Sequence, residues 1–438
     1  MFFFRKKHRE FGWLFCHSMI LGLLVPAIQA QGTLQKDLEP TRVMTAVKPV
    51  QQSAVQGTRS LMSTNQTNPG LPLWTYFTES SRDFGGYSGV MVGRDPFNGG
   101  GSVSVPANIV PLIIVTNAIA TGVGSDGKYT TKPGVTKFDP TSSDNACLTA
   151  PNNVPLSLFR QSPLFENADF NFGGTDVGKT QYVDAFQRGE FWQALGNEVS
   201  EYHLFLHPVK SLTPIVINVP AAHGLARPTM LTGGRTICGP QARVDIDWFD
   251  NYLNRVVIPA LGAQGVAPAN LPVFLVYNTV WGIPAVDPRQ CCILGYHSGT
   301  NTIPIQTYSV ADFDETRYFP LAFQDTATLS HEIAEWANDP FVNNLTPAWG
   351  NTGQVIGACQ NNLEVGDPLS DAEAPRIAMP NGFTYHLQEL AFFSWFYGSP
   401  SVGIHNWYSN NGSFLTDAGP PCQPPASSSG SSATWIIR

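Results

Sequence analysis

The chain has 438 residues, of which only 13% are charged, well below the roughly 25% of ordinary soluble domains. Its 25 basic and 33 acidic residues give a net charge of −8, and the scattered basic residues exclude a nucleic-acid partner. Glycine (40) and proline (35) lack the fixed period of collagen, and an aromatic content of 11% excludes a largely disordered chain. We expect a folded, loop-rich protein with much β structure.

The N-terminal segment has the features of an export signal. A basic stretch at residues 5–9 precedes an apolar run at 11–28, and small residues suited to cleavage end at Ala30. Residues 1–30 are therefore predicted to be a signal peptide, and the mature protein to be periplasmic or extracellular with no membrane segment. The alternative is an uncleaved anchor, for which the run is short. Residues 31–70, rich in Gln, Thr and Ser, are predicted to form a flexible lead-in.

Residues 71–200 are predicted to form a β-rich region. Short apolar runs between Gly and Pro residues indicate strands at 73–77, 87–92 and 109–115, and a helix is expected at 180–195. This pattern fits either a separate β module or the first half of one larger domain.

Residues 201–422 are predicted to form a second region, in which strands and helices alternate. Strands are expected at 215–219 and 273–277, and helices at 244–261 and 326–338. Asp325 is a suitable N-cap for the last helix, and Pro340 should end it. A strand at 303–308 is predicted at a sheet edge because Pro304 has no N–H to donate. A mobile Ser-rich tail is expected at 423–438.

Six cysteines remain once Cys16 leaves with the signal peptide: Cys147, Cys238, Cys291, Cys292, Cys359 and Cys422. An even number in an exported protein indicates up to three disulfide bonds. A bridge between the adjacent Cys291 and Cys292 would be strained, so we expect them to face different partners. There is no C-x-x-C pair, which argues against a zinc ribbon or a thioredoxin-type motif.

The segment from Ser330 to Glu335, Ser-His-Glu-Ile-Ala-Glu, contains the strongest chemical signal. On a helix, positions i and i+4 share a face, so His331 and Glu335 can reach one metal ion. Glu332 lies beside them and can act on water bound to that ion without being a ligand. This is the arrangement of H-E-x-x-H with a glutamate as the second ligand.

A second acidic segment, Leu-Glu-Val-Gly-Asp at residues 363–367, can complete the site. A catalytic zinc ion has three protein ligands and an open fourth position, and one ligand often comes from a separate element. Glu364 is the candidate third ligand. Asp367 is expected to accept a hydrogen bond from the other ring nitrogen of His331, which would fix its tautomer.

On these motifs the sequence resembles the zincin metallopeptidases, especially those with a glutamate third ligand. The resemblance implies an α+β fold, here preceded by the β-rich region and containing disulfides, with a mixed sheet and an active-site helix. It implies a zinc-dependent peptidase in which Glu332 is the general base, and an edge strand, here 303–308, that pairs with an extended peptide or protein substrate. Glu335 departs from the family pattern because it replaces a histidine. The added negative charge makes Mn or Ca more competitive with Zn.

Two other interpretations stay open. The helix carrying His331 could be a solvated face, or the same residues could form a non-catalytic module that clamps a structural ion, with Asp339 as a further ligand or supporting group. A weaker resemblance to the secreted plant EXORDIUM or phosphate-induced proteins rests on residues 291–297, which run from Cys-Cys to Gly-Tyr-His. His297 and His386 are candidate contacts to the substrate or its oxyanion, or substitute ligands.

Overall fold

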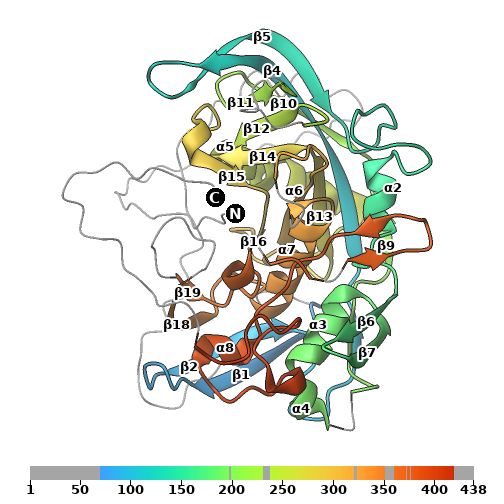
Figure 1. Cartoon of the computed structure of the whole chain (residues 1–438), viewed down its shortest axis with the longest axis vertical. Coiled ribbons are helices and arrows are strands. Elements are labelled where there is room, and N and C mark those ends of the chain that lie inside the picture. Colours follow the sequence, from blue (N-terminus) through green and yellow to red (C-terminus); the bar gives the residue numbers. More distant parts are fainter. Residues whose placement is uncertain are drawn as a thin grey trace, which may run out of the picture. The chain divides into compact units, whose positions relative to one another are not determined.

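The computed structural model describes residues 70–196, 199–229, 237–319, 323–350, 360–370, 372–374 and 376–418. The predicted signal peptide, nearly all of the predicted lead-in, the Ser-rich tail, Cys16, Cys359 and Cys422 lie outside these ranges. Within them the protein is a mixed α/β structure built around one eleven-stranded mixed sheet (Figure 1). No helix of the described ranges is long and apolar enough to cross a membrane.

The large sheet joins strands from both predicted regions. Its order is β15-β14-β12-β11-β4-β13-β17-β16, with β5, β9 and β10 also paired to the long strand β4. The strands are β4 (Ala107–Val123), β5 (Tyr129–Phe138), β9 (Val209–Ser211), β10 (Ile215–Val219), β11 (Gly224–Arg227), β12 (Gln241–Asp245), β13 (Leu271–Tyr277), β14 (Thr279–Gly282), β15 (Cys291–Ile293), β16 (Gly295–Gly299) and β17 (Thr307–Phe313). Because β4 lies between β11 and β13, residues 71–200 and 201–422 share one sheet.

Five two-stranded sheets surround the large one. They pair β1 (Leu73–Glu79) with β2 (Gly86–Val92), β3 (Ser102–Ser104) with β8 (His203–Phe205), β6 (Ala168–Phe172) with β7 (Thr175–Thr180), β18 (Leu345–Trp349) with β19 (Gln360–Asn362), and β20 (Ile377–Ala378) with β21 (Thr384–Tyr385). The predicted strands at 73–77, 87–92, 109–115, 215–219 and 273–277 are thereby confirmed.

The predicted edge strand at 303–308 is wrong in both position and role. The strand is β17, which begins at Thr307, after Pro304, and all of its residues are buried. It lies between β13 and β16, so the edge on this side of the sheet is β16, which pairs antiparallel to β17. An edge strand does precede the helix of residues 326–338, but it carries His297.

Helices cover both faces of the sheet, and they differ from the predictions mainly at their ends. The α-helices are α2 (Pro155–Arg160), α3 (Tyr182–Glu190), α4 (Trp192–Leu195), α5 (Ile246–Tyr252), α6 (Ile258–Leu261), α7 (Ala327–Asn338) and α8 (Phe393–Tyr397). A π-helical turn, Leu253–Val257, joins α5 to α6. The predicted helix at 244–261 starts later than expected because β12 extends to Asp245, and the one at 180–195 is divided at Phe191.

Alternate residues of the central strand β13 face two different cores. Val273 and Leu275 belong to the core that includes Ile333 and Trp336 of α7. Phe274 and Val276 belong to the core that includes Phe249 of α5 and Leu261 of α6. Both faces of the central strands are therefore covered, as their continuous apolar sequences predict.

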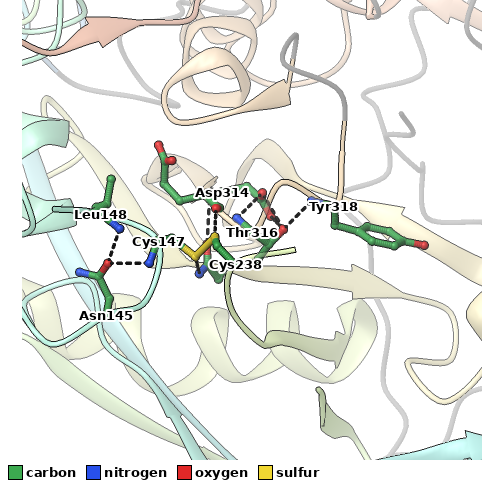
Figure 2. The surroundings of a disulfide bond; sticks show 9 residues. Asn145, Cys147, Leu148, Cys238, Asp314, Thr316 and Tyr318 are labelled. Carbon is green, nitrogen blue, oxygen red and sulfur yellow. Dashed lines mark hydrogen bonds between the residues drawn. A yellow bond between two sulfur atoms is a disulfide. The ribbon is translucent and has the colours of Figure 1, made fainter. Parts of the chain in front are cut away.

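One disulfide joins distant parts of the chain. Cys147 and Cys238 are bonded across a sequence separation of 91, beside the loop that follows β17 (Figure 2). The Cys238 N–H donates to the carbonyl oxygen of Thr316 (3.1 Å), which ties this bridge to that loop. Cys291 and Cys292, which were expected to face different partners, have their sulfur atoms against each other across a cis peptide bond.

Glu190 at the end of α3 should make stability depend on pH. The residue is fully buried, and its Oε1 accepts from the N–H of Phe393 (2.5 Å). Burial raises the pKa of Glu190 from 4.5 to about 8. Between these values the folded state keeps a proton that the unfolded state has lost, so stability falls as pH rises from 4.5 to 8.

Glu190→Gln should therefore raise the unfolding midpoint relative to wild type above pH 8, with a difference that shrinks toward pH 4. Urea titrations at several pH values measure this. Glu79→Gln, at an exposed position in β1, is the control and should leave the pH profile unchanged. A Glu190→Gln variant that loses most stability at high pH would contradict the expectation.

Candidate metal centre

Helix α7 presents a row of polar side chains to the interior. It packs against β16, β17, β2 and α3, and its apolar residues Leu329, Ile333 and Trp336 belong to the core. It begins one residue later than predicted, with Thr326 at the N-cap position, and Asp325 Oδ1 accepts from the Thr326 N–H (2.5 Å). Every residue of the helix is buried, so the interpretation of α7 as a solvated face is wrong.

His331, Glu335 and Asp367 form the first of two groups that could hold a metal ion. His331 Nε2 lies 2.9 Å from Glu335 Oε1 and 3.6 Å from Asp367 Oδ1. Zinc bonds of 2.0–2.2 Å in tetrahedral geometry place neighbouring donor atoms about 3.3–3.6 Å apart. The distance to Asp367 lies in this range, the distance to Glu335 is shorter and has the length of a hydrogen bond, and all three donor atoms lie within 4.8 Å of one another, so the residues could hold such an ion.

The orientation of the His331 ring is fixed from its far side. Nδ1 lies 2.9 Å from Gln388 Oε1, while Gln388 Nε2 donates to the carbonyl oxygen of Gly366 (2.5 Å). This places the imidazole proton on Nδ1 and turns Nε2 toward Glu335 and Asp367. Gly366 lies so close to the ring that a Cβ atom there would overlap it, which explains the glycine.

Asp367 thus lies on a different side of His331 from the one expected. The sequence predicts that Asp367 accepts from the second ring nitrogen, but its Oδ1 faces Nε2, and Gln388 occupies the second position. Gln360 Nε2 donates to Asp367 Oδ2 (2.8 Å), which leaves Oδ1 turned toward the histidine. This buried Oδ1 has no hydrogen-bond partner among the described residues.

His297, Glu335 and Glu364 form the second group. His297 Nδ1 lies 3.4 Å from Glu335 Oε2 and 3.4 Å from Glu332 Oε2, while Nε2 lies 3.8 Å from Glu364 Oε2. In both groups the candidate donor atoms lie within 4.8 Å of one another and all residues are buried. Of the predicted ligands, Glu335 belongs to both groups, but His331 and Glu364 fall in different ones.

The electrostatics of these groups reflect strong repulsion among buried carboxylates. Burial raises the pKa of Glu332 to about 7, and burial together with the charge of Glu335 raises that of Asp367 to about 7 and that of Glu364 well above its ordinary value. Burial opposes ionisation of Glu335 as well, but His331 and His297 outweigh it and lower its pKa to about 2. Burial opposes protonation of the two histidines, but the carboxylates outweigh it, raising the pKa of His331 to about 9 and that of His297 well above its ordinary value. Protonated histidines therefore supply positive charge here, and a metal ion would replace it.

Asp339 and His386 lie outside both groups. The Asp339 carboxylate accepts from the N–H groups of Asn343 (2.8 Å) and Asn344 (3.0 Å), and its carbonyl oxygen accepts from His297 Nε2 (3.1 Å). Asp339 thus holds His297 through its backbone. His386 Nδ1 pairs with Asp325 Oδ2 (2.5 Å) near the start of α7.

Sequence reasoning missed Gln388 and Gly366. Gln388 belongs to no motif in the sequence, and Gly366 lies within the acidic segment 363–367, but the roles of both are recognisable only through their contacts with His331. His297 was singled out, but its place beside Glu335 depends on the pairing of β16 with β17. Comparisons of this chain with known protein families, with curated protein sequences and with solved structures find no match.

Proposed function

We propose that this protein is an exported metal-dependent hydrolase, of the zincin type, that cleaves peptide bonds. The observation that supports it most is the convergence of His331 Nε2, Glu335 Oε1 and Asp367 Oδ1 beside Glu332. Zinc is the proposed ion because it accepts histidine nitrogen and carboxylate oxygen as ligands, and the second carboxylate makes Mn²⁺ the main competitor. Asp367 replaces Glu364 as the third ligand in this proposal.

When bound, zinc would polarise the scissile carbonyl and lower the pKa of a water molecule. Glu332 is fully buried next to the proposed ligands, and its Oε1 makes no hydrogen bond within the described part of the chain. This oxygen can take the proton of the attacking water and later deliver it to the leaving amine. Gln388 and Gly366 hold the His331 ring in the orientation that the ligand role requires.

A second candidate function is favoured by burial. The proposed ligands are at most 2% exposed, which suits an ion that stabilises the fold without catalysis. Such a non-catalytic module would bind metal but have no hydrolytic activity.

The test is to measure metal content and peptidase activity of the purified protein together. We expect tightly bound zinc by elemental analysis and chelator-sensitive cleavage of a peptide library analysed by mass spectrometry. His331→Ala should lose both, and the control His223→Ala, in a histidine paired with Asp245, should keep both. Metal without cleavage would establish the structural role, and a metal-free protein that cannot be loaded would refute both functions.

A further inference from the structure

Glu335 lies between two histidines, and each of its carboxylate oxygens faces a different one. Oε1 is 2.9 Å from His331 Nε2, and Oε2 is 3.4 Å from His297 Nδ1. Asp367 completes the group of His331, and Glu364 completes the group of His297, with its Oε2 3.8 Å from Nε2, the ring nitrogen that does not face Glu335. A carboxylate placed in this way can bridge two ions.

Both histidines turn a bare nitrogen toward Glu335 when neutral. His331 donates its Nδ1 proton to Gln388, and His297 donates its Nε2 proton to the carbonyl oxygen of Asp339 (3.1 Å). The nitrogen that remains on each ring carries a lone pair and lies against a carboxylate oxygen. In the absence of a metal ion a proton on this nitrogen binds the facing carboxylate oxygen, and a metal ion that displaced the proton on either side of Glu335 would be held by the same two atoms.

Once metal ions displace its protons, the charge of the cluster matches two ions. Glu332, Glu335, Glu364 and Asp367 are each at most 7% exposed. When ionised they carry four negative charges, so one divalent cation leaves two of these uncompensated in the interior. Glu332 Oε1 is in addition buried with no hydrogen-bond partner among the described residues. Two divalent cations balance the four carboxylates.

We propose that the site holds two divalent cations bridged by Glu335, one bound by His331 and Asp367 and the other by His297 and Glu364. The first ion is that of the proposed function, on which this inference therefore rests. The mixed nitrogen and oxygen donors suit Zn²⁺ or Mn²⁺. Paired hydrolytic ions lie about 3.5–4 Å apart, a separation that a single carboxylate can bridge.

The test is metal stoichiometry on the full mature chain. Protein stripped with chelator is reloaded with Zn²⁺, desalted and analysed for zinc per chain. Wild type and the control Glu190→Gln, a buried glutamate outside both groups, should bind two ions. Glu364→Gln and Asp367→Asn should each bind one, and Glu335→Gln should weaken both. Circular dichroism and thermal unfolding of each variant establish that it is folded.

Loading with Mn²⁺ gives an independent measurement. Wild type should show the electron paramagnetic resonance spectrum of a magnetically coupled pair, and Glu364→Gln that of an isolated ion. One zinc per chain in wild type, unchanged in Glu364→Gln, would overturn the second ion while leaving the proposed function standing. No bound zinc in wild type would overturn both.

Discussion

Replacing Glu332 by glutamine is expected to abolish peptide hydrolysis while leaving metal binding intact. Glutamine has nearly the same shape, so packing in the fully buried position should be retained. It has no basic oxygen to take the proton of water, and loss of a general base typically costs about 10²–10⁴-fold in rate. Steady-state cleavage of a peptide found in the library screen, with metal content measured on the same sample, checks this.

The matched control for Glu332→Gln is Glu190→Gln. It makes the same exchange at another fully buried glutamate, in α3, which packs against α7 but lies outside both groups. It should keep both metal and activity. Full activity in Glu332→Gln would refute the assigned role, and loss of metal in that variant would show that Glu332 is itself a ligand.

Removal of the Cys147–Cys238 bridge should lower the free energy of unfolding by about 4–5 kcal/mol, because a closed loop of this length restricts the unfolded chain strongly. The separation of 91 residues is what makes the effect large. Urea unfolding of the Cys147→Ser, Cys238→Ser double variant, compared with oxidised wild type, measures it.

The adjacent residues Cys291 and Cys292 provide the control for the prediction about the Cys147–Cys238 bridge. Cys291 and Cys292 are adjacent, so a bond between them would close almost no loop. The double exchange Cys291→Ser, Cys292→Ser should therefore change stability much less than the first. Equal losses in the two double variants would show that loop closure is not the source of the stabilisation.

The sequence allowed prediction of those elements whose local pattern and tertiary environment agree. Helix α7 could be predicted because Leu329, Ile333 and Trp336 recur at helical spacing, and these residues do face the core. The strand before α7 was predicted at 303–308, too early in the sequence, because Pro304 and its polar neighbours do not indicate where strand pairing begins. The start of β17 at Thr307 depends on its partners β13 and β16.

The candidate site was predictable to the extent that it lies in one helix and one short segment. His331, Glu332 and Glu335 are brought together by helical spacing alone. The positions of His297, Gln388 and Asp367 around them depend on how β16 and two loops pack against α7, and no local spacing encodes this. Asp367 and Glu364 are close in sequence, so only the packed structure could distinguish which one faces His331.

Because β4 lies in the middle of the large sheet, its position affects where the chain can be cut into fragments and how the sheet forms during translation. Both neighbours of β4 in the strand order, β11 and β13, come much later in the sequence. A fragment without β4 would expose two unpaired strand edges, which favour aggregation. During translation β4 can pair at once with the next strand, β5, but its pairing with β11 and β13 must wait for distant segments, and such long-range pairing is slow. A cut at the boundary near residue 200 therefore separates β4 from β11 and β13 and leaves neither piece with the whole sheet.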